Sequence, residues 1–206
     1  AEFKNIAEQI LQDGAKGFGE MTALHFCFSE THHFEQTEPD HPLFLLLADI
    51  AAEYDVPIDL HMEIIPQDQL LPSGLNDICM DNPSLVAENT DAFERLLAHN
   101  REARIVLQHV GWDNTGYKDV VYLRRMLTKH SNLFMALKFV NPEFEPFNEG
   151  NEMFDAERNL RPEWLQLFKD FPDRFVIGAD EFVGASDQVK SSRLPSFADT
   201  WSVMEQ

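Results

Sequence analysis

Four short apolar runs in this chain each end on a side chain that can bind a metal ion or move a proton. The runs, with their last residues, are 17–20 (Glu20), 57–61 (His61), 104–109 (His109) and 174–180 (Asp180). Strands that are buried on both faces of a parallel sheet read as near-continuous hydrophobic runs. Because the carboxyl ends of parallel strands meet at one edge of the sheet, we expect these side chains to share one site there.

Segments with helical periodicity alternate with these runs. Helices are expected within 1–12, 40–54, 82–97, 117–130 and 162–171, and strands within 14–21, 57–64, 104–110, 133–139 and 174–180. Asp40 is expected to cap the second helix, and Asn82 with Pro83 to open the third. The acidic stretches 30–40 and 143–157 are expected to be solvated loops, with a lid over the site as the alternative.

This alternation indicates right-handed βαβ units and a parallel sheet, either open and doubly wound or closed as a (β/α)8 barrel. The sequence contains neither GxGxxG nor a Walker loop, which favours the barrel over an open nucleotide-binding sheet. The expected fold class is therefore α/β, with a TIM-barrel-like arrangement. Five strands do not close such a barrel, so 1–206 is expected to be a single but partial barrel domain.

Charge and composition exclude several classes of partner. Lys and Arg total 16 against 36 Asp and Glu, and the net charge of -20 would repel nucleic acid and anionic lipid surfaces. Cys27 and Cys79 have no CxxC spacing, so reduced, inert thiols are expected. No run approaches the ~18 apolar residues of a membrane span. We expect a soluble protein, with the cytoplasm favoured and the oligomeric state, including a homo-oligomer, left open.

The two histidines that end apolar runs are the strongest candidates for chemistry. Strand alternation puts Asp59, His61 and Glu63 on one face, and a neutral imidazole beside carboxylates suits Zn²⁺ or a similar ion. His109 precedes a glycine turn at Gly111 and could bind a metal, polarise a carbonyl or shuttle a proton. For both residues the alternative is a structural histidine that is hydrogen-bonded to a neighbour.

The remaining candidates each have a plainer alternative. Asp180 could ligate a metal and accept a proton from water, or be an ordinary turn aspartate. Glu20 could be a metal ligand, a carboxylate that orients a histidine, or a salt-bridge partner. Lys138 could counter an anionic substrate group or be solvated, and Trp112 is a further candidate for substrate contact. His25 and the other histidines have loop or helix-end interpretations that need no chemistry.

Other catalytic schemes lack their characteristic spacing. The sequence contains no GxSxG, no HExxH, and no strand-end cysteine paired with a histidine. Metal-assisted chemistry therefore leads among the catalytic hypotheses.

Taken in order, the segments GAKGFGEM, VPIDLH, RIVLQHVG, SNLFMALKF and DRFVIGAD resemble strands four to eight of the metal-dependent amidohydrolase superfamily. The resemblance is to the amidohydrolase-related branch that includes carboxymuconate-semialdehyde decarboxylase and lactone hydrolases. It implies a distorted (β/α)8 barrel with one divalent metal, zinc above all, with Mn or Fe as alternatives. It further implies metal ligands at His61 and Asp180, a catalytic or substrate-binding histidine at His109, and Glu20 on the fourth strand.

By this resemblance the chain is expected to be a metal-dependent hydrolase of a C–O or C–N bond in a small lactone, ester or amide. The alternatives are a non-oxidative decarboxylase of the same family and a non-catalytic ligand-binding barrel that has lost its metal. One departure bears on this choice, because the HxH pair of the family's first strand occurs nowhere in this sequence. Either the chain represents part of the fold or its metal site is degenerate.

Overall fold

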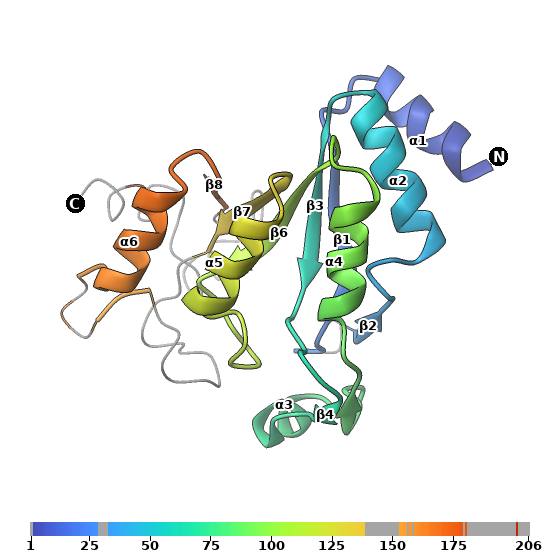
Figure 1. Cartoon of the computed structure of the whole chain (residues 1–206). Coiled ribbons are helices and arrows are strands. Elements are labelled where there is room, and N and C mark those ends of the chain that lie inside the picture. Colours follow the sequence, from blue (N-terminus) through green and yellow to red (C-terminus); the bar gives the residue numbers. More distant parts are fainter. Residues whose placement is uncertain are drawn as a thin grey trace, which may run out of the picture.

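A mostly parallel sheet forms the centre of the molecule (Figure 1). The computed structural model describes residues 2–28, 33–138, 153–155, 157, 159–178, 180 and 201, apart from the side chains of Ser73 and Asn76. In spatial order the strands are β2 (Glu35–Gln36), β1 (Phe18–His25), β3 (Pro57–Met62), β6 (Arg104–Val110), β7 (Leu133–Leu137) and β8 (Phe175–Ile177). Only β2 is antiparallel to its neighbour; the other adjacent strands are parallel.

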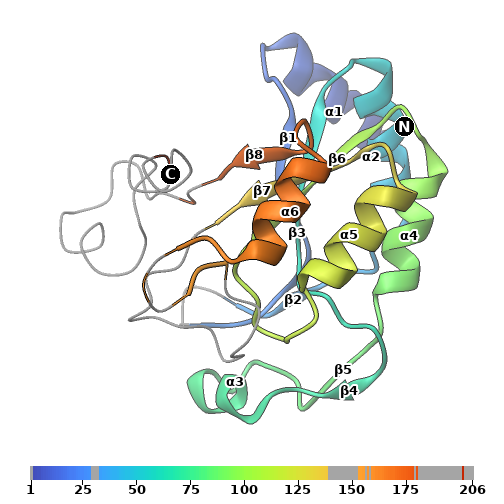
Figure 2. The same ribbon diagram turned by 60° about the vertical axis from the view of Figure 1, so that its left-hand side comes forward.

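The parallel strands are adjacent in the order in which they occur along the chain, with no reversal of direction across the sheet. The connecting helices are α2 (Pro42–Glu53), α4 (Thr90–His99), α5 (Val120–Lys129) and α6 (Pro162–Asp170), and α1 (Glu2–Gln12) precedes β1. Right-handed crossovers between sequential strands place all such helices on the same face of a sheet. Figure 2 shows α4, α5 and α6 side by side along this face.

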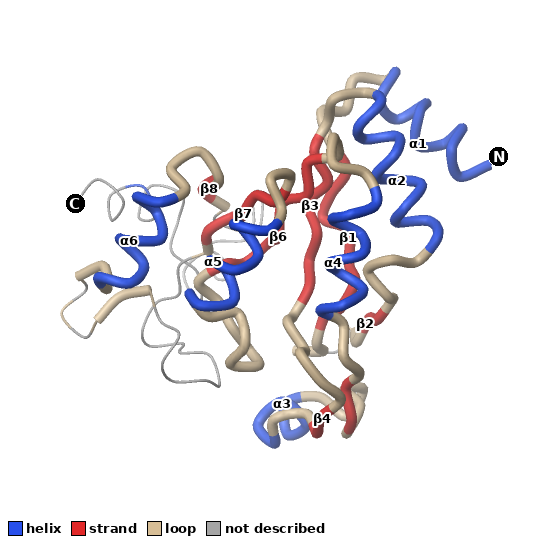
Figure 3. The backbone as a smooth tube through the Cα atoms, viewed as in Figure 1, coloured by secondary structure: helices blue, strands red, loops and turns tan. Residues whose placement is uncertain are grey.

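Polar contacts join each helix to the next one in this layer. Atoms Lys4 Nζ and Glu53 Oε2 lie 3.4 Å apart between α1 and α2, and a bond between Arg124 and Asp170 joins α5 to α6. Glu94 of α4 pairs with Arg125 and Lys129 of α5. The helices therefore form one layer in chain order, as Figure 3 also shows.

The core lies between this helical layer and the sheet. On β3, buried residues alternate with half-buried ones, and Ile58, Leu60 and Met62 are the buried set. This alternation leaves Asp59 and His61 on the other face, as the period of two in a strand requires. The α/β class and the parallel sheet expected from the sequence are thus confirmed, whereas closure into a barrel remains a prediction.

The segment between β3 and α4 differs from the expectation. It contains β4 (Gln69–Leu70), α3 (Ser73–Ile78) and β5 (Leu85–Val86), and α4 begins only at Thr90. The expected helix start at Asn82 is wrong because the Asn82 side chain instead bonds to the backbone of Cys27 and Leu75. Asn89 plays a similar role, since its side chain accepts from Ile65 N and donates to Glu63 O.

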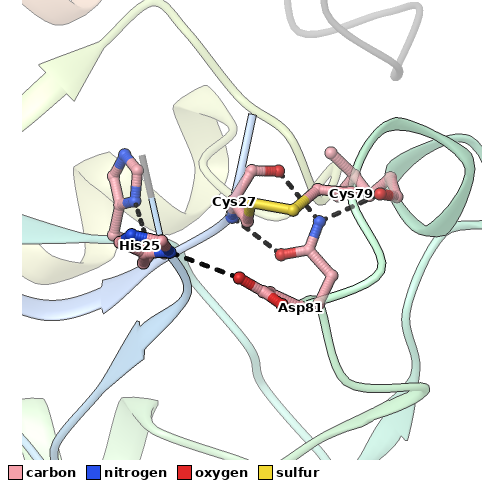
Figure 4. The surroundings of a disulfide bond; sticks show 7 residues. His25, Cys27, Cys79 and Asp81 are labelled. Atoms are coloured by element: carbon pink, nitrogen blue, oxygen red, sulfur yellow. Dashed lines mark hydrogen bonds and ion pairs between the residues drawn. A yellow bond between two sulfur atoms is a disulfide. The ribbon is translucent and has the colours of Figure 1, made fainter. Parts of the chain in front are cut away.

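Cys27 and Cys79 form a disulfide, with their Cα atoms 5.7 Å apart (Figure 4). The expectation of reduced thiols is therefore wrong. The two residues are 52 positions apart and meet only because the segment before α4 folds back onto the end of β1. Closing a loop of this length removes unfolded-state entropy worth on the order of 4 kcal/mol.

Several predicted boundaries also shift. The strand β1 continues through His25 rather than ending at 21, and β8 ends at Ile177. The cap of α2 is His41, whose Nδ1 accepts from Leu43 N at 3.2 Å, because Asp40 pairs with Arg95 instead. The helix α5 begins after Asp119, which caps it, and not at 117.

The acidic stretches are described only in part. The first contains the short strand β2, with 30–32 outside the described residues, and most of the second also lies outside them. Among the described helices, none combines the length and the apolar character needed to cross a bilayer.

Candidate metal centre

Three side chains from three adjacent strands converge on one point. The Glu20 Oε1 atom on β1 lies 2.5 Å from His61 Nδ1 on β3 and 2.6 Å from His109 Nε2 on β6. The ligand atoms of the three residues all lie within 4.8 Å of one another. One carboxylate oxygen and two imidazole nitrogens at this separation could hold a divalent metal ion.

The local backbone explains how Glu20 reaches this point. A Cβ atom on Gly19 would lie 2.6 Å from Asp59 Cβ, so the glycine is what allows β1 to approach β3 so closely here. The ladder between the two strands is irregular on both sides of the Met21 and Thr22 pairs. Glu20 therefore lies inside β1 and not at its end, which corrects the position expected from the sequence.

His109 occupies an unusual backbone conformation near the end of β6. Its φ is 58° and that of Gly111 is 102°, so the chain turns sharply through the left-handed region just after the imidazole. At Gly111 a Cβ atom would meet Lys138 O at 2.8 Å, which leaves room only for glycine. This turn directs the two ring nitrogens of His109 toward different carboxylates, Glu20 and Asp180.

Burial and hydrogen bonding shift the pKa values of Glu20 and His109. Burial alone would raise the pKa of Glu20, but its hydrogen bonds to His109 and His61 outweigh burial and hold its pKa well below the usual 4.5. Burial lowers the pKa of His109, against the opposing effect of Glu20. An ionised carboxylate beside a neutral imidazole is the donor state that metal coordination requires.

Asp180, Lys138 and Trp112 form a second group beside the first. The Lys138 Nζ atom lies 2.6 Å from Asp180 Oδ2 and 4.8 Å from the centre of the Trp112 ring. Asp180 Oδ2 is 3.9 Å from His109 Nδ1, longer than a hydrogen bond. The structure thus brings Asp180 next to His109, yet outside the group of three, and a direct ligand role for Asp180 stays a prediction.

The sequence did not reveal a buried ion pair, Glu63 with Lys118, which is linked through Asn114 to Trp112 of the second group. The side chains of Glu63 and Lys118 are 4% and 2% exposed, and their Oε2 and Nζ atoms are 3.6 Å apart. Glu63 Oε1 accepts from Asn114 Nδ2, and Asn114 Oδ1 accepts from Trp112 Nε1. No local pattern around Lys118 signals this pairing, because its partner lies 55 residues earlier in the chain.

The loop or helix-end position expected for His25 is wrong, because His25 belongs to a strand. It ends β1, and its ring centroid lies 4.8 Å from that of His61, which in turn lies 4.6 Å from that of His109. A signal was present, because the run MTALH is itself apolar and ends on a histidine, as the four recognised runs end on ionisable groups. Three imidazoles therefore lie in a row across β1, β3 and β6.

Comparisons of the chain with protein-family models, with curated proteins and with solved structures found no match.

Proposed function

We propose that this chain is a metal-dependent hydrolase that cleaves a C–O or C–N bond of a small lactone, ester or amide. The observation that carries the proposal is the convergence of Glu20, His61 and His109, whose ligand atoms lie within 4.8 Å of one another. The sequential strand order and the single helical layer suit a (β/α)8 barrel, whose active sites lie at the carboxyl ends of the strands.

The donor set fits a catalytic metal. Two imidazoles and one carboxylate are a common ligand set for catalytic zinc, and they leave a further coordination position for water or substrate. Glu20 Oε1, His61 Nδ1 and His109 Nε2 are the atoms that would hold the ion. Such an ion polarises a carbonyl group and lowers the pKa of water to ~7.

The other residues have defined tasks in this proposal. When its Nε2 binds metal, the His109 ring carries its proton on Nδ1, which faces Asp180 Oδ2 at 3.9 Å. Asp180 orients this ring and accepts the proton that the attacking water releases. The Lys138 ammonium, held between Trp112 and Asp180, counters negative charge on the substrate.

Metal content is the first test of this proposal. Protein purified without chelator and kept oxidised should carry close to one equivalent of zinc, manganese or iron by elemental mass spectrometry. His61→Ala should lose this metal while its circular dichroism stays unchanged. His99→Ala, which removes a surface histidine paired with Asp49, is the matched control and should retain the metal. Equal metal content in both variants would contradict the proposal.

Activity is the second test. Hydrolysis of a panel of small lactones, esters and amides should be lost on chelation and should return when zinc is restored. Release of carbon dioxide from carboxylated substrates, without hydrolysis, would instead favour a non-oxidative decarboxylase that uses the same ligands.

One observation favours a non-catalytic ligand-binding protein as the second candidate. Glu20 Oε1 is already satisfied by both imidazoles at 2.5 and 2.6 Å, so the three groups can form a hydrogen-bonded cluster without an ion. In that case the purified protein would carry no metal, would take up none from micromolar zinc, and would be indifferent to chelator.

A further inference from the structure

A second group of metal-binding side chains lies beyond the end of β1, apart from the Glu20 group. The Cys27 and Cys79 sulfur atoms and an Asp81 carboxylate oxygen all lie within 4.8 Å of one another. Figure 4 shows the three side chains gathered around the disulfide, with His25 beside them. His33 Nδ1 lies 3.3 Å from Asp81 Oδ2 and borders the same spot.

The positions of the two cysteines do not depend on the disulfide alone. Cys27 N donates to Asn82 Oδ1 at 2.7 Å, and Asn82 Nδ2 donates to Cys27 O at 3.0 Å and to Leu75 O at 2.9 Å. Asn82 is buried, and it joins the end of β1 to the segment that carries Cys79. These bonds would keep the two sulfur atoms close together after the disulfide is reduced.

The aspartate is not needed by a disulfide but suits a metal ion. Reduction would leave two thiols beside a carboxylate, and without a cation the negative charge of Asp81 opposes their ionisation. A bound divalent cation removes this conflict because it stabilises both thiolates and the carboxylate. Thiolate ligands select zinc over magnesium or calcium.

We propose that the reduced protein binds one zinc ion through Cys27 Sγ, Cys79 Sγ and the Asp81 carboxylate. The same residues thus have an oxidised disulfide state and a reduced zinc state. The Asp81 side chain is 59% exposed whereas Cys27 is fully buried, so the ion enters from the Asp81 side. The proposal is independent of the function proposed for the Glu20 group.

The change of state balances by thiol–disulfide exchange. A dithiol reductant donates two electrons, its own sulfurs become a disulfide, and the Cys27–Cys79 bond becomes two thiols. Zinc binding then releases the two thiol protons to solvent. After removal of zinc, exchange with an added small-molecule disulfide, which is itself reduced to two thiols, restores the Cys27–Cys79 bond.

The test compares oxidised and reduced full-length protein in the His61→Ala background, in which the Glu20 group is disabled. Each form is stripped of metal, freed of reductant under anaerobic conditions and titrated with zinc against a chromophoric chelator. The reduced form should bind one more equivalent of zinc per chain than the oxidised form. Cobalt in place of zinc should give a thiolate-to-metal charge-transfer absorption band in the reduced form only.

Variants assign the ligands. Cys79→Ser should abolish the additional equivalent, and Asp81→Asn should weaken zinc binding at least tenfold. Asp77→Asn, which removes a neighbouring exposed carboxylate in α3, should leave zinc binding unchanged. Equal zinc binding by the two redox forms, a cobalt complex without the thiolate band, or half an equivalent of zinc per chain would overturn the proposal. An Asp81→Asn variant with unchanged affinity would also overturn it.

Discussion

The Glu20 group and the Lys138–Asp180 pair lie next to each other but are held in place in different ways. Glu20, His61 and His109 lie inside β1, β3 and β6, so strand pairing and the packed core determine their positions. Lys138 and Asp180 follow the last residues of β7 and β8, and Asp180 is held by its ion pair with Lys138. The Glu20 group is therefore preorganised, which suits metal binding. The Lys138–Asp180 pair is adjustable, which suits contact with a substrate.

The largest expected effect comes from the buried Glu63–Lys118 pair, which is linked through Asn114 to Trp112 beside the site. Lys118→Met should lower the free energy of unfolding by about 3–5 kcal/mol, because it leaves the Glu63 carboxylate buried without a countercharge. Urea denaturation followed by circular dichroism measures this change. Lys129→Met removes a lysine that pairs with Glu94 at the surface and should cost less than about 1 kcal/mol. If the two variants lose similar free energies of unfolding, the buried Glu63–Lys118 pair contributes no more to stability than a surface pair.

The next effect concerns the preorganised group. Glu20→Gln keeps the shape of the side chain but removes its charge, and should weaken zinc binding to the oxidised protein by about 100-fold or more. Competition with a chromophoric chelator measures the affinity. Glu35→Gln, at an exposed position on β2, is the matched control and should leave it unchanged. If Glu20→Gln binds zinc as tightly as the control, Glu20 is not a metal ligand.

A smaller effect is expected in the adjustable pair. Asp180→Asn should weaken zinc binding by about tenfold, since Asp180 supports His109 from 3.9 Å without entering the group of three. The variant should unfold within about 1 kcal/mol of the parent because the Lys138–Asp180 pair is partly exposed. If its loss of affinity equals that of Glu20→Gln, Asp180 is a direct ligand, as the sequence suggested, and the distinction between the two groups fails.

The smallest effect is expected at Glu94 in the helical layer. Glu94 takes no part in the candidate site, so its substitution serves as a reference for the other variants. Burial raises the pKa of Glu94, but the hydrogen bond and charge of Lys129 outweigh it, so the folded-state pKa lies below the usual 4.5. A carboxyl group with a lowered folded-state pKa stabilises the fold above its unfolded pKa, and this stability is lost as the pH falls. Between pH 7 and pH 4, Glu94→Gln should therefore lose less stability than the parent, by no more than about 1 kcal/mol. If the free energy of unfolding of Glu94→Gln depends on pH in the same way as that of the parent, Glu94 does not contribute to this pH dependence.

The sequence predicted the parts of the molecule that follow local periodicity. The helices and the placement of His61 on the face of β3 opposite its buried residues follow from repeats of 3.6 and two residues, which neighbouring positions specify. Glu20 contacts both imidazoles because β1 approaches β3 closely at Gly19. This position was not predictable, because no pattern within GFGE distinguishes the interior of a strand from its end. His25 was expected in a loop or at a helix end, although the apolar run MTALH that it ends is typical of a strand.

Contacts between distant segments were not predictable from the sequence in this way. The Cys27–Cys79 disulfide and the Glu63–Lys118 pair each join positions more than fifty residues apart, and each depends on how a loop folds back. Asn82 looked like a helix start because asparagine before proline is a common capping signal, yet its side chain bonds to the backbone of Cys27, just beyond the end of β1. In each case a tertiary contact decided the role of the residue.

The proposed function depends above all on Glu20, His61 and His109 binding one metal ion together. The most direct measurement is the anomalous scattering of zinc in crystals of the oxidised protein grown with zinc. We expect one peak at about 2.0–2.2 Å from Glu20 Oε1, His61 Nδ1 and His109 Nε2. The absence of a peak at these three atoms, with zinc in excess, would contradict it.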